Sequence, residues 1–242
     1  MKKIYKYTKL IPLALILLFI QGCVKSRDEY IYIQIGTVKK IEISETEPEK
    51  KFYFLLDSNE ELYPRVDEGY LSKRLDHNDR VIVQFTEVEQ YASKKELHAK
   101  IQMIHPIRTV DIEFADKEDI SNQLANSNTV NITEAYIANG FLTLKYSYLG
   151  GYKPDKDHKF KMLAFHAPLL EPESRVETED IARLTLIHDA KEDTGTQIQN
   201  GIISFPTDNI KSLLEDKEQL NITINTVYDG IKEYTINLKK SR

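Results

Sequence analysis

Residues 220–238 read LNITINTVYDGIKEYTINL, and this stretch decides the fold. Two runs of alternating apolar and polar residues flank Asp229 and Gly230. Alternation with a period of two is typical of a strand with one buried face, and Asp-Gly between two such runs is a strong hairpin signal. Both turn residues tolerate a positive φ, so the pattern predicts a type I′ turn within antiparallel β-structure.

The same alternation recurs along most of the chain. In residues 80–88, for example, Val81, Val83 and Phe85 share one strand face and Arg80 lies on the other, because side chains alternate along a strand. The other segments that predict strands are 30–38, 52–57, 98–104, 140–152, 158–165 and 181–188.

The alternation fails over residues 116–128, DKEDISNQLANSN, where acids, Ser and Asn replace it. We interpret this segment as a linker or short helix between two β-rich domains, residues 30–115 and residues 129–242. In the second domain, Leu142, Leu144, Tyr146 and Tyr148 share one face of a strand. Many short strands with frequent turns predict an all-β fold made of barrels or sandwiches.

One short helix is expected in the second domain, at residues 205–217, FPTDNIKSLLEDK. Thr207 or Asp208 is suited to the N-cap, because either side chain can accept a hydrogen bond from the first turn. Ile210, Leu213 and Leu214 fall on one face at helical spacing. We expect a crossover helix that seals the end of a sheet.

Residues 1–22 have the pattern of a secretory signal peptide. Four lysines and no acid precede an apolar run from Leu10 to Ile20. A helix of that length is about 16 Å long and cannot cross a bilayer core of about 30 Å. A basic segment, a short apolar segment and a small residue before the cleavage point are the features of a cleaved export signal.

The end of that segment, LFIQGC, resembles a lipobox, the site at which bacterial signal peptidase II cuts before a lipid-modified cysteine. Cys23 is the sole cysteine in the chain, so we expect it to carry the lipid, including palmitate, and residues 23–29 to act as a tether. The alternative is an ordinary secretory signal beside a chance cysteine. Val24 after the cysteine favours the outer membrane, and Asp28 and Glu29 leave both the periplasmic and the surface face open.

Charge excludes one class of partner. Removal of residues 1–22 takes away four lysines and no acid, so the formal charge changes from −5 to −9. An acidic chain repels phosphate backbones, so we expect no nucleic acid partner.

No catalytic motif with specific spacing is present, and we expect a protein that is not an enzyme. Asp155, Asp157 and His158, in KPDKDHK, place three potential ligands close together. We expect a solvated hairpin tip there and no metal. Tyr30 and Tyr32 share a strand face and are candidate ligand-binding residues, because exposed aromatic rings stack on sugars. The alternative is that both are half-buried strand residues without a ligand.

Four segments follow Cys23 in the order IQIGTVKKI, FYFLLDSNEELYP, DRVIVQFTEV and HAKIQMIHPIRTVDI. This order, with FLTLKYSYLGGY and the final Asp-Gly hairpin, resembles the NigD-like lipoproteins. The resemblance implies an N-terminal OB-type barrel and a C-terminal β-sandwich. It implies no catalytic residues and no cofactor, and it suggests a role in bacteriocin immunity because the family takes its name from a bacteriocin gene neighbourhood.

We therefore expect an exported, non-catalytic lipoprotein that is anchored through Cys23 and presents a binding surface in the bacterial cell envelope. Its expected partners are the membrane, through the lipid, and an envelope protein, a bacteriocin or a glycan. Two alternatives are an immunity protein that captures a toxin and a hydrolase of envelope polymers whose carboxylate pair is assembled only in the fold.

Overall fold

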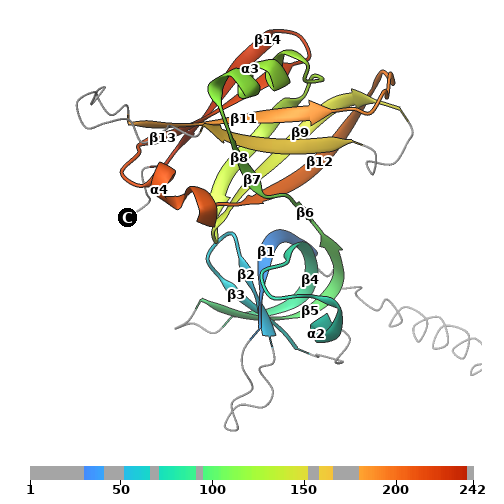
Figure 1. The fold of residues 1–242 in the computed structure, drawn as a ribbon. Coiled ribbons are helices and arrows are strands. Elements are labelled where there is room, and N and C mark those ends of the chain that lie inside the picture. Colours follow the sequence, from blue (N-terminus) through green and yellow to red (C-terminus); the bar gives the residue numbers. More distant parts are fainter. Residues whose placement is uncertain are drawn as a thin grey trace, which may run out of the picture.

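The computed structural model describes residues 30–40, 52–65, 71–90, 95–151, 158–165 and 180–238. Within these residues the chain forms two β units, a closed five-stranded barrel and a sandwich of two sheets (Figure 1). This confirms the all-β fold and the order of barrel and sandwich that the sequence predicts. The expected signal peptide, the tether and Cys23 lie outside the described residues.

The barrel closes in the order β1-β2-β3-β5-β4. Val81, Val83 and Phe85 are each at most 1% exposed, as the alternation in β4 predicts. They pack in one apolar cluster with residues of the other strands. A short helix, α2 (Leu71–Arg74), precedes β4 in the chain. The barrel strands are β1 (Tyr32–Lys40), β2 (Phe52–Leu56), β3 (Glu61–Pro64), β4 (Arg80–Gln90) and β5 (Glu96–Pro106).

The sandwich has one sheet in the order β14-β13-β11-β10-β7 and a second in the order β6-β12-β9-β8. The predicted face of β9, Leu142, Leu144, Tyr146 and Tyr148, is buried in the core between the sheets. The strands are β6 (Arg108–Thr109), β7 (Ile112–Ala115), β8 (Asn131–Ala138), β9 (Phe141–Gly150), β10 (Lys159–Phe165), β11 (Ile181–Asp189), β12 (Gln197–Pro206), β13 (Gln219–Thr226) and β14 (Gly230–Asn237).

Residues 116–128, expected to be a linker or a short helix between the units, contain a helix, and the strands just before them belong to the sandwich. β6 pairs with β12 and β7 pairs with β10, so the sandwich already includes residues that precede this segment. The segment itself forms α3 (Lys117–Ala125), which lies against β10, β11 and β13. The strand-like alternation is absent from this segment because it is helical, and none of the residues of α3 is buried.

The predicted hairpin at β13 and β14 forms, but the predicted turn type is wrong. Thr226 pairs with Gly230, which leaves a three-residue loop, and Gly230 has a φ of 69° while Asp229 is not among the residues with positive φ. The two-residue turn with positive φ at both positions occurs instead at Asn139 (53°) and Gly140 (81°), between β8 and β9. Asn-Gly is the favoured pair for a type I′ turn.

The predicted helix at residues 205–217 is shorter than expected. β12 continues to Pro206, and the helical part is a 3₁₀ turn, η1 (Asp208–Ile210), followed by a single turn, α4 (Lys211–Leu214). The hydroxyl of Thr207 makes no capping hydrogen bond and donates instead to the Gly140 carbonyl at 3.0 Å. The expected apolar face is confirmed, because Ile210 is buried and the two leucines of α4 pack on the sandwich core.

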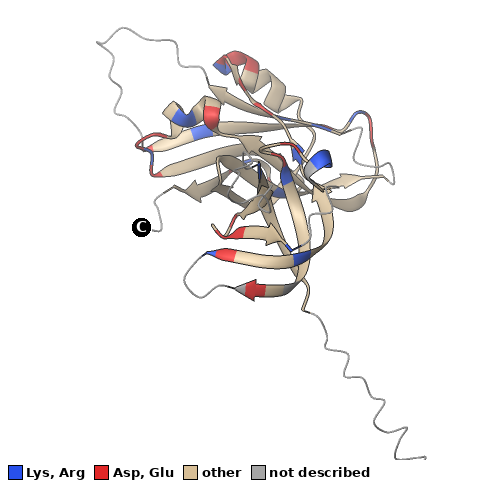
Figure 2. Ribbon diagram, turned by 90° about the horizontal axis from the view of Figure 1, so that it is seen from below, with Lys and Arg blue, Asp and Glu red and all other residues tan. Residues whose placement is uncertain are grey.

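Charged residues are distributed over both units, and basic and acidic positions are interspersed along the described strands and helices (Figure 2). None of the helices in the described parts of the chain is long and apolar enough to span a membrane.

Candidate ligand-binding groove

The junction between the two units is built around a buried arginine. The Arg80 side chain donates two hydrogen bonds of 2.7 Å to the two carboxylate oxygens of Asp57, which follows β2. The same guanidinium donates to Thr37 of the barrel and to Thr143 of the sandwich, each at 2.9 Å. A planar guanidinium matches a carboxylate in this paired geometry. Arg80 therefore bonds to both units at once.

Two sandwich residues complete this junction. The Tyr136 hydroxyl donates to Asp57 at 2.8 Å, and the Asn139 amide donates to Asp57 and to the carbonyls of Leu55 and Leu56 at 3.1 Å. Burial and the Asp57 carboxylate raise the pKa of Tyr136 above its usual value, so the phenol keeps the proton that it donates. We call Thr37, Asp57, Arg80, Tyr136, Asn139 and Thr143 the junction cluster.

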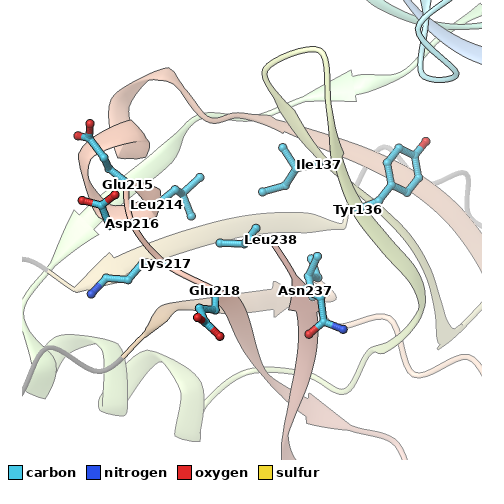
Figure 3. Close-up of a pocket in the computed structure, with 10 residues that line it drawn as sticks. Tyr136, Ile137, Leu214, Glu215, Asp216, Lys217, Glu218, Asn237 and Leu238 are labelled. Atoms are coloured by element: carbon cyan, nitrogen blue, oxygen red, sulfur yellow. The ribbon is translucent and has the colours of Figure 1, made fainter. Parts of the chain in front are cut away.

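A groove of about 1050 Å³ lies next to this cluster, at the side of the sandwich where β8 and β14 form the edges of their sheets. Leu214, Ile137 and Leu238 point toward one another across its floor (Figure 3). Tyr136 forms part of its wall, and the hydroxyl of the same residue is bonded to the barrel. The junction cluster thus holds one wall of the groove in place.

The rim of the groove is acidic. Glu215, Asp216 and Glu218 line it together with Lys217 (Figure 3). α4 ends where Glu215 adopts an extended conformation (φ −62°, ψ 134°), and the left-handed conformation of Asp216 (φ 60°) then turns the chain toward β13. This turn places the acidic segment beside the apolar floor, so the groove combines an apolar surface with negative charge.

A second buried polar cluster lies within the sandwich. His158 Nδ1 and His188 Nε2 are 2.8 Å apart, and the outer ring nitrogens contact Asp193 at 3.1 Å and the Thr129 carbonyl at 3.0 Å. The His188 ring stacks on Phe160 with a centroid distance of 4.6 Å. We call His158, His188 and Asp193 the histidine cluster. His158 is therefore a buried residue and not part of the solvated hairpin tip that the sequence predicted, while Asp155 and Asp157 lie outside the described residues.

Backbone donors fix the acid of the histidine cluster. The Gly151 and Gly195 amides each donate to Asp193 at 2.8 Å, and together with the contact from His158 they lower the pKa of Asp193 to about 2. A Cβ at Gly195 would lie 1.8 Å from the Gly151 nitrogen, so only glycine allows this close approach. The donors commit the carboxylate to a structural role, and among the described residues no group of three or more His, Cys, Asp or Glu side chains is arranged so that it could hold a metal ion.

The two candidate tyrosines lie on the barrel, away from the groove lining. Tyr30 is 78% exposed, and its ring centroid lies 5.5 Å from that of Tyr32 at an interplanar angle of 48°. The Tyr32 ring stacks on Phe85 at 5.4 Å, at the edge of the barrel core. The two rings are therefore neighbours but do not form a flat stacking platform, and their role in binding stays a prediction.

Sequence reasoning missed the junction cluster and the groove. Arg80 was expected on the face of β4 opposite Val81, which is correct, but alternation does not indicate that the sandwich covers that face. The groove residues come from β8, the segment after α4 and the end of β14, which are far apart in the sequence. The Asn139–Gly140 pair does predict a tight turn, and this turn places Asn139 against the barrel.

Comparisons with known proteins agree with this architecture. The family model described as the NigD-like N-terminal OB domain matches residues 35–107, and that described as the NigD-like C-terminal beta sandwich domain matches residues 111–238. No curated protein matches the chain.

Several solved structures share the fold. A protein of unknown function from Bacteroides vulgatus is 15% identical, with a TM-score of 0.65 over 88% of this chain and 92% of its own. A candidate lipoprotein from Bacteroides fragilis is 10% identical, with a TM-score of 0.62 over 88% of this chain and 100% of its own. A NigD-like immunity protein from Bacteroides caccae is 16% identical, with a TM-score of 0.57 over 87% and 99%.

At these identities the structural likeness shows the fold alone, whereas the sandwich model by itself matches more than half of the chain. The chain belongs to the NigD-like protein family, with an N-terminal OB domain and a C-terminal β-sandwich.

Proposed function

We propose that the chain is an exported, lipid-anchored, non-catalytic binding protein of the bacterial cell envelope, and that the groove beside the junction cluster holds its ligand. The signal peptide pattern and Cys23 support export and anchoring. The name of one similar structure, a candidate lipoprotein, agrees with this location. The groove supports binding because it is a concave surface with an apolar floor and a charged rim.

The observation that carries the proposal is the combination of floor and rim. Ile137, Leu214 and Leu238 offer apolar contact area, while Glu215 and Asp216 place exposed carboxylates at its edge. A ligand that matches both features has an apolar side and positive charge, which describes a cationic amphipathic peptide segment. Complementary charge directs association, and apolar burial provides most of the affinity.

The bonding of two partly buried acids supports a non-catalytic role. Both oxygens of Asp57 are bonded to Arg80, and both oxygens of Asp193 accept backbone N–H groups. A general acid or base must exchange its proton with a substrate, and these carboxylates are committed to protein donors. The hydrolase alternative remains a prediction that requires a carboxylate pair elsewhere.

A second candidate function, immunity against a bacteriocin, uses the same groove. The acidic rim would suit a cationic peptide toxin, and one protein of the same fold is named a NigD-like immunity protein. A gene deletion distinguishes an immunity protein from a general binding protein. An immunity protein predicts that deletion of its gene makes the cell sensitive to a peptide toxin, whereas a general binding protein predicts no such sensitivity.

The binding test uses a fluorescent decapeptide of alternating lysine and leucine, and a matched glutamate and leucine decapeptide as the charge control. We expect the lysine peptide to bind the mature chain and Leu238→Asp to raise its Kd about tenfold, because a factor of ten corresponds to about 1.4 kcal/mol, roughly the burial energy of one apolar side chain. Glu215→Lys with Asp216→Lys should raise the Kd about threefold to tenfold and reduce the salt dependence.

Matched controls lie on other surfaces. Glu118→Lys reverses an exposed charge on α3, and Ile198→Asp adds a charge at an exposed apolar position of β12. Both should leave the anisotropy titration unchanged. Equal affinity for the two peptides would refute the groove as a cationic peptide site. So would an equal loss of affinity for the lysine peptide in the groove variants and the control variants.

A further inference from the structure

The start of the described chain is an exposed apolar surface. Tyr30, Ile31, Tyr32 and Ile33 are 78%, 54%, 40% and 66% exposed, and Met103 of β5 is 48% exposed. Single exposed apolar residues are common on proteins, but a contiguous group of them marks an interaction surface. Ile31, Ile33 and Met103 lie on the outer face of the barrel, whereas Tyr32 pairs with Phe85 of the core, and we call Ile31, Ile33 and Met103 the β1 patch.

Strand pairing explains why the side chains of the β1 patch face outward. Ile33 pairs with Gln84, and Gln84 pairs with Met103, so the three residues form a row across β1, β4 and β5. The neighbouring positions Val83 and Phe85 point into the barrel core. Because side chains alternate along a strand, the row of Ile33, Gln84 and Met103 lies on the outer wall of the barrel. The patch therefore adds nothing to the barrel core.

The patch is distant from the sandwich. Gln84 is four residues along β4 from Arg80, which bonds to the sandwich at Thr143. At about 3.3 Å per residue, the row lies roughly 13 Å along the strand from the junction. The sandwich lies on the far side of the junction from the body of the barrel (Figure 1). A partner on the β1 patch would thus leave the groove accessible.

The patch is also close in sequence to the proposed lipid anchor. Eight Cα–Cα steps join Cys23 to Ile31, and such a segment spans at most about 29 Å. A lipid in the bilayer would therefore keep the patch within that distance of the membrane and raise its effective concentration there.

We propose that the β1 patch docks on the lipid surface next to the anchor, and that this contact fixes the barrel against the membrane with the sandwich directed away from it. The inference rests on the proposed function, because it assumes the anchor at Cys23. The contact is apolar, since the acidic mature chain repels anionic head groups. It therefore requires a zwitterionic bilayer and is insensitive to salt.

The test exploits the absence of tryptophan from the chain and its single cysteine. The mature chain, residues 23–242, is coupled through Cys23 to a maleimide lipid in phosphatidylcholine vesicles with brominated acyl chains. Ile33→Trp reports from the patch, and Ile198→Trp reports from a similarly exposed isoleucine on β12 of the sandwich, 68% exposed. Brominated chains quench a tryptophan that touches the lipid.

We expect quenching of the tryptophan at position 33 to be at least about threefold stronger than at position 198, with no change between low and high salt, since apolar contact is not screened. Adding Ile31→Asp and Met103→Asp should reduce quenching at position 33 to the level at position 198, because both charges would have to enter the lipid. Equal quenching at the two positions in the unmodified patch would overturn the proposal.

Failure of the anchor is detected separately, because the maleimide tether does not depend on lipidation in the cell. Cells that express the full chain are grown with labelled palmitate, beside cells that express Cys23→Ala. An unlabelled full chain would refute the proposed lipid anchor whatever the vesicle result. A labelled chain whose tryptophan at position 33 is not quenched would refute membrane docking alone.

Discussion

The junction cluster and the histidine cluster are both buried and polar, but they differ in what they join and in which groups they contain. The junction cluster connects barrel to sandwich through the guanidinium of Arg80, which stays charged at any ordinary pH. The histidine cluster lies within the sandwich and links two imidazole rings to Asp193. Between the units the donor is a permanently charged guanidinium, whereas within the sandwich the linked groups are two imidazole rings and a carboxylate.

The two clusters also differ in which units supply the donors to their carboxylates. The Asp57 carboxylate accepts hydrogen bonds from Arg80, Tyr136 and Asn139, so one acid satisfies donors from both units. Asp193 accepts from two backbone amides and one imidazole, all in the sandwich. Loss of the first cluster should therefore affect how the units are held together, and loss of the second should affect only the sandwich.

The largest expected effect is at Arg80. Arg80→Met removes the buried cation and leaves the partly buried Asp57 carboxylate without its counter-charge, which should lower the free energy of unfolding by about 3 kcal/mol in urea titrations. Adding Asp57→Asn should recover part of the loss, because the remaining partly buried group is then neutral. A loss below about 1 kcal/mol for Arg80→Met would mean that the junction cluster contributes little to stability.

A smaller effect, dependent on pH, is expected at Asp193. Its pKa of about 2 in the folded chain lies below the value near 3.9 of an unfolded aspartate, so its contribution is complete above pH 4 and is lost as pH falls through 2. The free energy of unfolding, measured from pH 5 to pH 2, should therefore fall less steeply in Asp193→Asn than in the parent chain. Parallel curves for the two chains would contradict the assignment.

The fold could be predicted because alternation directly reports which strand face is buried. The buried face of β4 and the core face of β9 follow from Val81, Val83, Leu142 and Leu144 in the sequence. The turn type at Asp229 could not be predicted from the pair alone, because the register of Thr226 with Gly230 decides the loop length. Local patterns thus identify strands better than they identify register.

The candidate site was not predictable, for a different physical reason. A polar residue on a strand, such as Arg80, has the same local pattern whether water or a second domain covers it. His158 was expected in solvent because turn-forming residues precede it, yet packing against His188 buries it. Groove residues such as Ile137 and Leu238 come together only when the two sheets pack, so no short motif contains them.

The central claim is that the junction cluster joins barrel and sandwich into one rigid body that frames the groove. Pulsed electron spin resonance can measure the distance between spin labels at Lys73→Cys on α2 and Ile198→Cys on β12, in a Cys23→Ala background that removes the chain's only other thiol. We predict one narrow distance distribution in this parent chain and a broad one after Arg80→Met. A broad distribution in the parent chain, or an equally narrow one after Arg80→Met, would contradict the claim.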